Sequence, residues 1–191
     1  ITEILDLTRA RLAGGIPVRP SSCDVHALSK RVLKELQAVH PERVFSFEVK
    51  GPGAASVDAE RLEQAVGNLI SNACQHSPAG MPIEVESHAE EGVWSLRVHN
   101  WGSPIAPERL PEIFHPFRSG AANRGVHMGP GLGLGLYIVQ EIAHAHGGAV
   151  TVDSTAEEGT CFVLTIPTQV RTGPAREGTR ADPVQRKTGT P

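Results

Sequence analysis

The chain has 191 residues, a formal net charge of −3 and three widely separated cysteines. This length suits one domain with short extensions, and the small negative charge argues against a nucleic-acid-binding surface. The cysteines lack metal-site spacing and fit a reducing setting, and no signal peptide or membrane-length apolar run is present, so we expect a cytoplasmic domain of a soluble or membrane-anchored protein.

The first predicted element is an amphipathic helix over residues 1–13. Its apolar side chains recur at helical spacing, and Gly14-Gly15, Pro17 and Pro20 end it. Because such a helix cannot bury its apolar stripe alone, we expect it to pack on an upstream helix or on a partner chain. The chain starts at Ile1 rather than at Met, so we interpret it as a fragment of a longer protein.

A second helix is predicted from about Val25 to Val39, with Ser22 or Asp24 as its N-cap. Residues 44–49 alternate between apolar and polar side chains, which is typical of a half-buried strand. Gly51-Pro52-Gly53 then predicts a turn.

The longest predicted helix is capped by Asp58 and runs to about Gln75. Asn68 and Asn72 are four residues apart on it, so they lie one above the other on the same stripe. His76-Ser77-Pro78 and Gly80 end the helix. The alternative interpretation of the two asparagines is a pair of polar residues on a solvated helix face.

The second half of the chain is predicted to consist of strands, one helix and short connections. Residues 118–130 are polar and glycine-rich, which favours a mobile loop, and residues 168–191 lack any core pattern, which favours disorder. In chain order we expect strands at 82–89 and 93–100 forming a hairpin, a short helix at 107–111, a helix after residue 136 that stops at Gly147-Gly148, and strands near 149–154 and 160–166.

The stretch Gly129–Leu136 is the most distinctive in the chain, because glycines alternate with leucines and a helical pattern follows at once. Glycine lets backbone N–H groups approach a ligand, and a helix start adds unpaired donors and a positive dipole end. Together they predict an anion site, with phosphate the usual anion. The spacing fits neither the dinucleotide-binding fingerprint nor the Walker loop, and a flexible linker would not open into a patterned helix.

Four segments now resemble, in order and spacing, the motifs of the ATP-binding catalytic domain of bacterial sensor histidine kinases. This domain belongs to a larger group with gyrase, the Hsp90 chaperones and the mismatch-repair ATPases. The resemblance covers about residues 24–167, and His146-Gly-Gly148 and the last strand also fit. The segments are Arg61–Ala73 (the N box), Val98–Ile105 (the first glycine box), Ile113–Phe117 (the F box) and Gly131–Leu136 (the second glycine box).

The resemblance implies a two-layer α/β sandwich of the Bergerat type, in which a mixed sheet packs on about three helices. It also implies a division of the chain. Residues 1–15 would be the end of an upstream dimerisation and phosphoacceptor helix, residues 24–167 the ATP-binding domain, and residues 168–191 a disordered tail.

The resemblance assigns ATP and Mg²⁺ as cofactors. Asn72 would bind Mg²⁺ through its carbonyl oxygen, which suits an ion that takes oxygen ligands and phosphate, and Asn68 lies beside it in the catalytic set. Gln75 replaces a frequent lysine and His76 stands where the family has tyrosine or histidine, so a phosphate-binding cation is missing there. Arg118 or Arg124 could supply the charge, although each is equally explained as a solvated surface residue.

Asn100 departs from the family, which most often has aspartate to accept a hydrogen bond from the adenine amino group. An amide oxygen also accepts, but without charge assistance. We therefore expect adenine selectivity to be retained with weaker binding. Gly102 would approach the base and Ile105 would form an apolar wall, while Pro104 replaces a second glycine and fixes φ at that turn.

The remaining predicted binding residues lie around the glycine-rich loop. Phe114 and Phe117 either anchor this loop or simply fill the core, and His115 is expected at the surface. The resemblance assigns nucleotide contacts to Phe117, Arg118, Gly131, Leu132, Gly133, Leu134, Gly135 and Leu136, with some leucines packing inward to hold the turn.

The hydrolysing relatives carry glutamate where this chain has Asn68, which is a poor base, so phosphoryl transfer to a separate acceptor is favoured over ATP hydrolysis. The implied acceptor is a histidine on an upstream helical hairpin, and no histidine of this chain has the required acidic neighbour. The implied partners are that hairpin, a response-regulator receiver domain and a second copy in a homodimer. A nucleotide-binding module without transfer activity and, more remotely, an ATP-gated dimer clamp are the alternatives.

Overall fold

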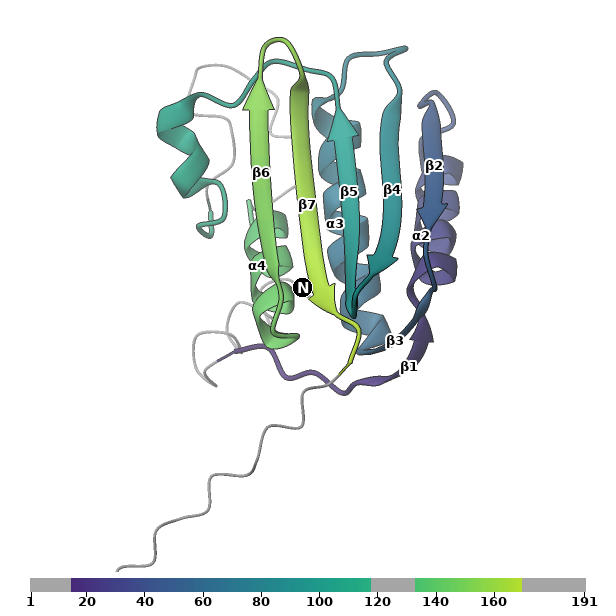
Figure 1. The fold of residues 1–191 in the computed structure, drawn as a ribbon. Helices are drawn as coiled ribbons and strands as arrows, with labels where there is room; N and C mark the ends of the chain where they lie inside the picture. Colours follow the sequence, from purple (N-terminus) through teal and green to yellow (C-terminus); the bar gives the residue numbers. More distant parts are fainter. Residues whose placement is uncertain (1–14, 118–132, 170–191) are drawn as a thin grey trace, which may run out of the picture.

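A computed structural model describes residues 15–117 and 133–169. The helix predicted over residues 1–13, the loop over 118–130 and the tail beyond residue 169 lie outside the described residues. The described chain forms two layers, with a five-stranded sheet on one side and three α-helices on the other (Figure 1). The predicted two-layer α/β sandwich is therefore confirmed.

The sheet is mixed, as predicted, and its strand order is β2-β4-β5-β7-β6. The pair β2 and β4 is parallel, while each of the other neighbouring pairs is antiparallel. The hairpin expected around residues 90–92 is the β4–β5 pair. The strands are β2 (Phe45–Lys50), β4 (Ile83–Glu90), β5 (Val93–Asn100), β6 (Ala149–Thr155) and β7 (Gly159–Pro167).

The three helices lie on one face of the sheet: α2 (Val25–Val39), α3 (Ala59–His76) and α4 (Gly135–Ala145) (Figure 1). Of the two candidate caps for α2, Asp24 is the N-cap, and its Oδ1 accepts hydrogen bonds from the N–H groups of His26 and Ala27. Asp58 caps α3 as predicted, accepting from Arg61 N–H at 3.2 Å. Both caps use donors that have no partner inside the helix.

Two short strands were not predicted from the sequence. A small antiparallel sheet joins β1 (Ser21–Asp24) to β3 (Ala54–Val57). These strands have four residues each, so they are too short to show a clear alternation, and their pairing depends on the chain folding back. The helix expected at residues 107–111 is a 3₁₀ helix, η1 (Pro107–Glu112), since Pro111 inside it cannot donate an α-helical hydrogen bond.

The core lies between the helices and the inner face of the sheet. Within it Trp94 is fully buried, and its Nε1–H donates to Ser87 Oγ at 2.8 Å. His26 Nδ1 lies 2.7 Å from the same hydroxyl, so the buried His26 links α2 to β4. None of the described helices combines the length and apolarity needed to cross a membrane.

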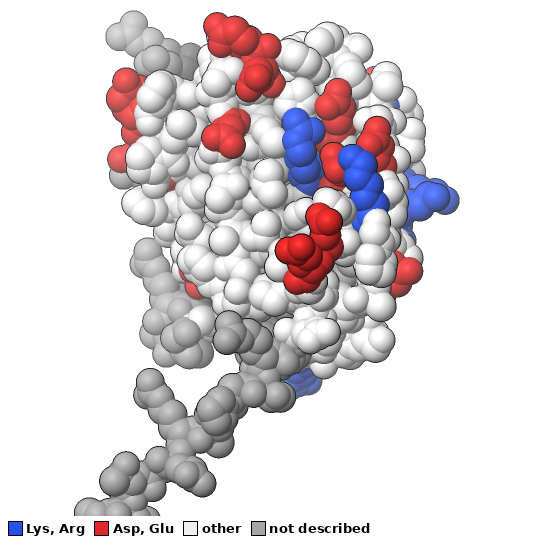
Figure 2. Space-filling view, in the orientation of Figure 1, with Lys and Arg blue, Asp and Glu red and all other residues white. Residues whose placement is uncertain are grey.

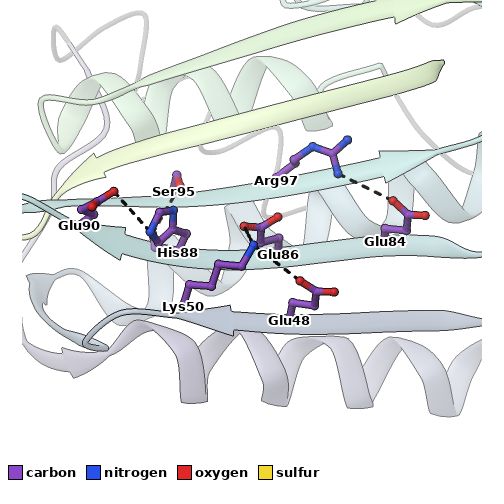
Figure 3. A network of polar contacts seen from close by, with 8 residues as sticks. All are labelled: Glu48, Lys50, Glu84, Glu86, His88, Glu90, Ser95 and Arg97. Atoms are coloured by element: carbon purple, nitrogen blue, oxygen red, sulfur yellow. Dashed lines mark hydrogen bonds and ion pairs between the residues drawn. The ribbon is translucent and has the colours of Figure 1, made fainter.

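The outer face of the sheet carries charged side chains instead of helices, mostly over β2, β4 and β5 (Figure 2). Lys50 Nζ lies 2.8 Å from Glu86 and 3.7 Å from Glu48, and Arg97 lies 3.8 Å from Glu84 (Figure 3). Because these pairs are exposed to water, each contributes at most about 1 kcal/mol to stability. These ion pairs keep the outer face of the sheet polar.

Candidate functional site

The fold brings the predicted asparagines of α3 to the start of α4. Asn68 Nδ2 donates to the carbonyl oxygen of Gly135 at 3.2 Å. A Cβ on Gly135 would lie 3.6 Å from Asn68 Cγ, so the two helices approach closely here. Asn72 follows one turn later on α3 and is half-buried. The N box and the second glycine box, which are far apart in sequence, therefore form one junction.

Asn100 ends β5 and is buried, with 2% of its surface exposed. Its Nδ2 donates to the carbonyl oxygen of Trp101 at 3.3 Å, whereas its Oδ1 has no hydrogen-bond partner among the described residues. The Trp101 carbonyl thereby orients the amide, because the flipped amide would place two acceptors against each other. A buried acceptor without a partner is costly, so it fits a ligand that donates a hydrogen bond.

The loop after β5 crosses the end of α3. A Cβ on Gly102 would lie 2.5 Å from the backbone oxygen of His76, so this position has no room for a side chain. Pro104 is exposed and Ile105 half-buried. Ile105 N–H donates to Ser154 Oγ at 2.9 Å, and that hydroxyl lies 2.7 Å from Thr160 Oγ1. Strands β6 and β7 thus hold the loop.

No role at the site was predicted for Ser154 or Thr160 from the sequence. In the strand pattern they are ordinary polar positions, and only the cross-strand pairing of β6 with β7 brings their hydroxyls together under the loop.

The start of α4 is joined to the end of the F box. Gly133 has φ of +67°, and its carbonyl oxygen accepts a hydrogen bond from Phe117 N–H at 3.0 Å. Phe117 is also in the left-handed region, with φ of 65°, and its side chain is 58% exposed. Strained backbone of this kind persists only where surrounding contacts fix it. Phe117 and Gly133, the described residues on either side of the segment 118–132, are therefore held together.

The two phenylalanines of the F box have different surroundings. Phe114 packs edge-to-face on the core residue Phe162, with ring centroids 6.4 Å apart, whereas Phe117 is exposed beside the loop. Leu134 is fully buried and Leu136 half-buried, as expected of leucines that hold the turn. The predicted contacts Arg118, Gly131 and Leu132, and the alternative cation Arg124, lie outside the described residues.

Gln75 and His76 lie exposed at the end of α3. Desolvation of the imidazole by the surrounding protein, and to a lesser extent the charge of Arg109 on η1, lower the pKa of His76 from its ordinary value of 6.5. Arg109 is a cation close to the candidate site that the sequence prediction missed. It lies in a short helix bounded by prolines, where no periodic pattern marks a residue as functional.

We expect His76 to be neutral at pH 7 and to titrate below pH 6.5. Because the pKa is lowered in the folded chain, the unfolded chain binds a proton on the His76 imidazole more readily than the folded chain does. The contribution of His76 to stability is therefore present above about pH 6.5 and is lost as the pH falls. NMR titration of the imidazole measures the pKa directly. Arg109→Gln should move it back toward 6.5, whereas Arg97→Gln on the outer face should not; equal values in all three proteins would contradict the role of Arg109.

Comparison with known proteins identifies this arrangement. Residues 57–170, more than half of the chain, match the family described as histidine kinase-, DNA gyrase B- and HSP90-like ATPase. The chain belongs to this family. The family match and the similarity to sensor histidine kinases make the chain an ATP-binding domain of the kind found in those kinases.

Curated relatives of this ATPase domain include sensor kinases. The bacteriophytochrome of Pseudomonas aeruginosa is 33% identical over 174 residues, which cover 91% of this chain and 24% of that protein. The sensor histidine kinase CusS of Escherichia coli is 42% identical over 110 residues, covering 58% of this chain and 22% of CusS. The chain therefore spans about a quarter of the length of these relatives.

Solved structures show the same fold. The catalytic domain of the histidine kinase ThkA has 26% sequence identity and a TM-score of 0.67, covering 79% of this chain and 97% of that domain. Full-length ShkA, solved in complex with AMPPNP, has 25% identity and a TM-score of 0.73, covering 87% of this chain and 34% of ShkA.

Proposed function

We propose that this domain binds Mg-ATP and transfers its γ-phosphoryl group to a histidine on an upstream helical hairpin. The observation that carries the proposal is the junction at which Asn68 of α3 holds the first residue of α4, Gly135. Asn72, whose side chain carries a carbonyl oxygen, follows Asn68 one turn later on the same helix. A helix start offers N–H donors and a positive dipole end to phosphate.

We assign the binding roles as follows. Asn100 accepts from the adenine amino group, with Gly102, Pro104 and Ile105 around the base. Asn72 is the Mg²⁺ ligand; its neutral oxygen suits an ion that completes its shell with phosphate and water. The described residues contain no group of three or more His, Cys, Asp or Glu side chains that could hold a metal ion. Further nucleotide contacts are assigned to Gln75, His76, Phe117, Arg118 and the segment Gly131–Leu136.

Asn68 supports transfer rather than hydrolysis. Its side chain lacks a basic group, and its N–H already donates to the Gly135 carbonyl. It is therefore suited to holding α4 in place and unsuited to activating water. ATP supplies the phosphoryl group, and the domain contributes positioning and charge neutralisation, which is most of what this reaction needs.

The wider assembly is part of the proposal. Residues 1–15 would be the end of the upstream acceptor helix, residues 24–167 the ATP-binding domain, and residues 168–191 a tail. The partners would be the acceptor hairpin, a response-regulator receiver domain and a second copy of the protein, acting in the cytoplasm. The histidine kinases among the relatives support this assignment.

The proposal is tested by joining the chain to the acceptor hairpin of a sensor-kinase relative and adding γ-labelled ATP. We expect acid-labile label on the hairpin histidine and none when that histidine is replaced by glutamine. Tight ATP binding without label would instead favour a nucleotide-binding module, which Asn100, Pro104 and the exposed Gln75 would then explain.

Asn100→Asp should tighten ATP binding by about fivefold, because a charge-assisted hydrogen bond is worth roughly 1 kcal/mol more than a neutral one. Isothermal titration calorimetry with ATP measures the change. Titration with GTP, whose 6-oxo group cannot donate to either residue, is the matched comparison and should show weak binding to both proteins. Unchanged or poorer affinity of Asn100→Asp for ATP would contradict the adenine role of residue 100.

A further inference from the structure

The segment 15–20 is packed across the base of the domain, at the end opposite the Asn100 end of β5 (Figure 1). Ile16 is 4% exposed and belongs to the hydrophobic core. Arg19 N–H donates to Asp58 Oδ2 at 2.7 Å, which is a charge-assisted bond. The segment is thus held by an apolar anchor and by one carboxylate oxygen.

Asp58 makes hydrogen bonds through both carboxylate oxygens and through its backbone N–H. Oδ1 accepts from Arg61 N–H and so caps α3, while Oδ2 accepts from Arg19 N–H. Its backbone N–H donates to His146 Nε2 at 3.1 Å. One residue therefore joins the segment 15–20, the start of α3 and the end of α4.

His146 is fixed for this role. Its Nδ1 lies 2.8 Å from the backbone oxygen of Ile142 and donates to it, which leaves Nε2 as the acceptor for Asp58 N–H. Helix α4 is then bonded to α3 at both ends, through Asn68 and Gly135 at its start and through Asp58 and His146 at its end.

We infer that Asp58 is a positioning residue that couples the segment 15–20 to α4. Helix α4 is rigid between its two hydrogen-bonded ends, so a ligand that restricts the motion of its start also restricts the motion of its end. Asp58, which is bonded to both His146 and Arg19, then restricts the motion of Arg19 as well. The coupling to nucleotide rests on the proposed function, whereas the docking of the segment on Asp58 does not.

The decisive variant is Asp58→Asn. Asparagine caps a helix as well as aspartate does, so α3 keeps its start. An amide offers one acceptor in place of two, however, and its Nδ2 would face the Arg19 N–H. Glu60→Gln is the matched control, because it makes the same carboxylate-to-amide change at an exposed position in the first turn of α3.

The docking of the segment 15–20 on Asp58 is measured by amide hydrogen exchange of the 191-residue chain, followed by NMR. Without nucleotide, Asp58→Asn should speed exchange at Arg19 by about tenfold or more, as expected for loss of a bond to a charged group, and Glu60→Gln should leave it unchanged. Equal exchange at Arg19 in the wild type and in Asp58→Asn would overturn the docking.

The coupling is read out by adding Mg-ATP, with binding measured separately by calorimetry. Nucleotide should slow exchange at Arg19 in the wild type. In Asp58→Asn that slowing should disappear while ATP still binds. In His146→Ala, Arg19 should stay protected without nucleotide but no longer respond to it.

The outcomes separate the two proposals. Wild-type protein that binds Mg-ATP without any change at Arg19 would overturn the coupling and leave the proposed function intact. Wild-type protein that does not bind Mg-ATP would overturn the proposed function and the coupling, and the nucleotide-free exchange would still decide the docking.

Discussion

Replacing Gly133 by valine should abolish ATP binding while the domain stays folded. Gly133 has φ of +67°, a region that a β-branched residue avoids, and its carbonyl oxygen holds Phe117 N–H at 3.0 Å. Valine would shift the backbone just before α4, where the phosphate contacts are proposed. The strain amounts to roughly 1–2 kcal/mol, which a domain stable by about 5–15 kcal/mol withstands.

The matched control for this change is Gly92→Val. Gly92 lies in the β4–β5 turn with φ of +79° and has open space around it, so valine there meets a similar backbone penalty far from α4. Calorimetric titration with ATP and thermal unfolding should show that both variants lose similar stability and that only Gly133→Val loses binding. ATP affinity of Gly133→Val equal to that of the wild type would refute the role of this glycine.

Asn72→Ala should lower phosphoryl transfer by about 100- to 1000-fold, because a metal that neutralises phosphate charge contributes several kcal/mol to the transition state. Asn72 is half-buried on α3 in the stripe that carries Asn68. Alanine is the best helix former, so the helix itself should persist. The measurement is the rate of labelling of the acceptor hairpin as the Mg²⁺ concentration is varied.

Ser71→Ala is the control for Asn72→Ala, since Ser71 is the preceding residue on the exposed side of the same helix. It should transfer at the wild-type rate. If Asn72→Ala kept a wild-type dependence of transfer on Mg²⁺, the metal ligand would have to be sought elsewhere.

Local features of the chain determined most of the elements. Apolar spacing predicted α2, α3 and the sheet strands to within about two residues, because amphipathic periods follow from the geometry of each element. Asp24 and Asp58 marked the helix starts, since a short acidic side chain satisfies the first free N–H groups. The order of four motifs also sufficed for the family, which the match over residues 57–170 confirms.

Only the tertiary structure decided how these parts meet. Asn68 and Gly135 are 67 residues apart, and Asp58 and His146 are 88 apart. Such contacts depend on how α3 and α4 pack against each other, which no local pattern records. The same reason explains why the β1–β3 pair, Arg109 beside His76 and the hydroxyls under the loop at Ile105 went unpredicted.

The amide of Asn100 shows most clearly the difference between what the sequence determines and what only the tertiary structure decides. The sequence placed an asparagine where the family has aspartate, but it could not say which atom of the amide is left for a ligand. Asn100 Nδ2–H donates to the Trp101 carbonyl, and the buried Oδ1 has no hydrogen-bond partner among the described residues. The folded backbone thus leaves the amide with an available acceptor oxygen, as a carboxylate would also have.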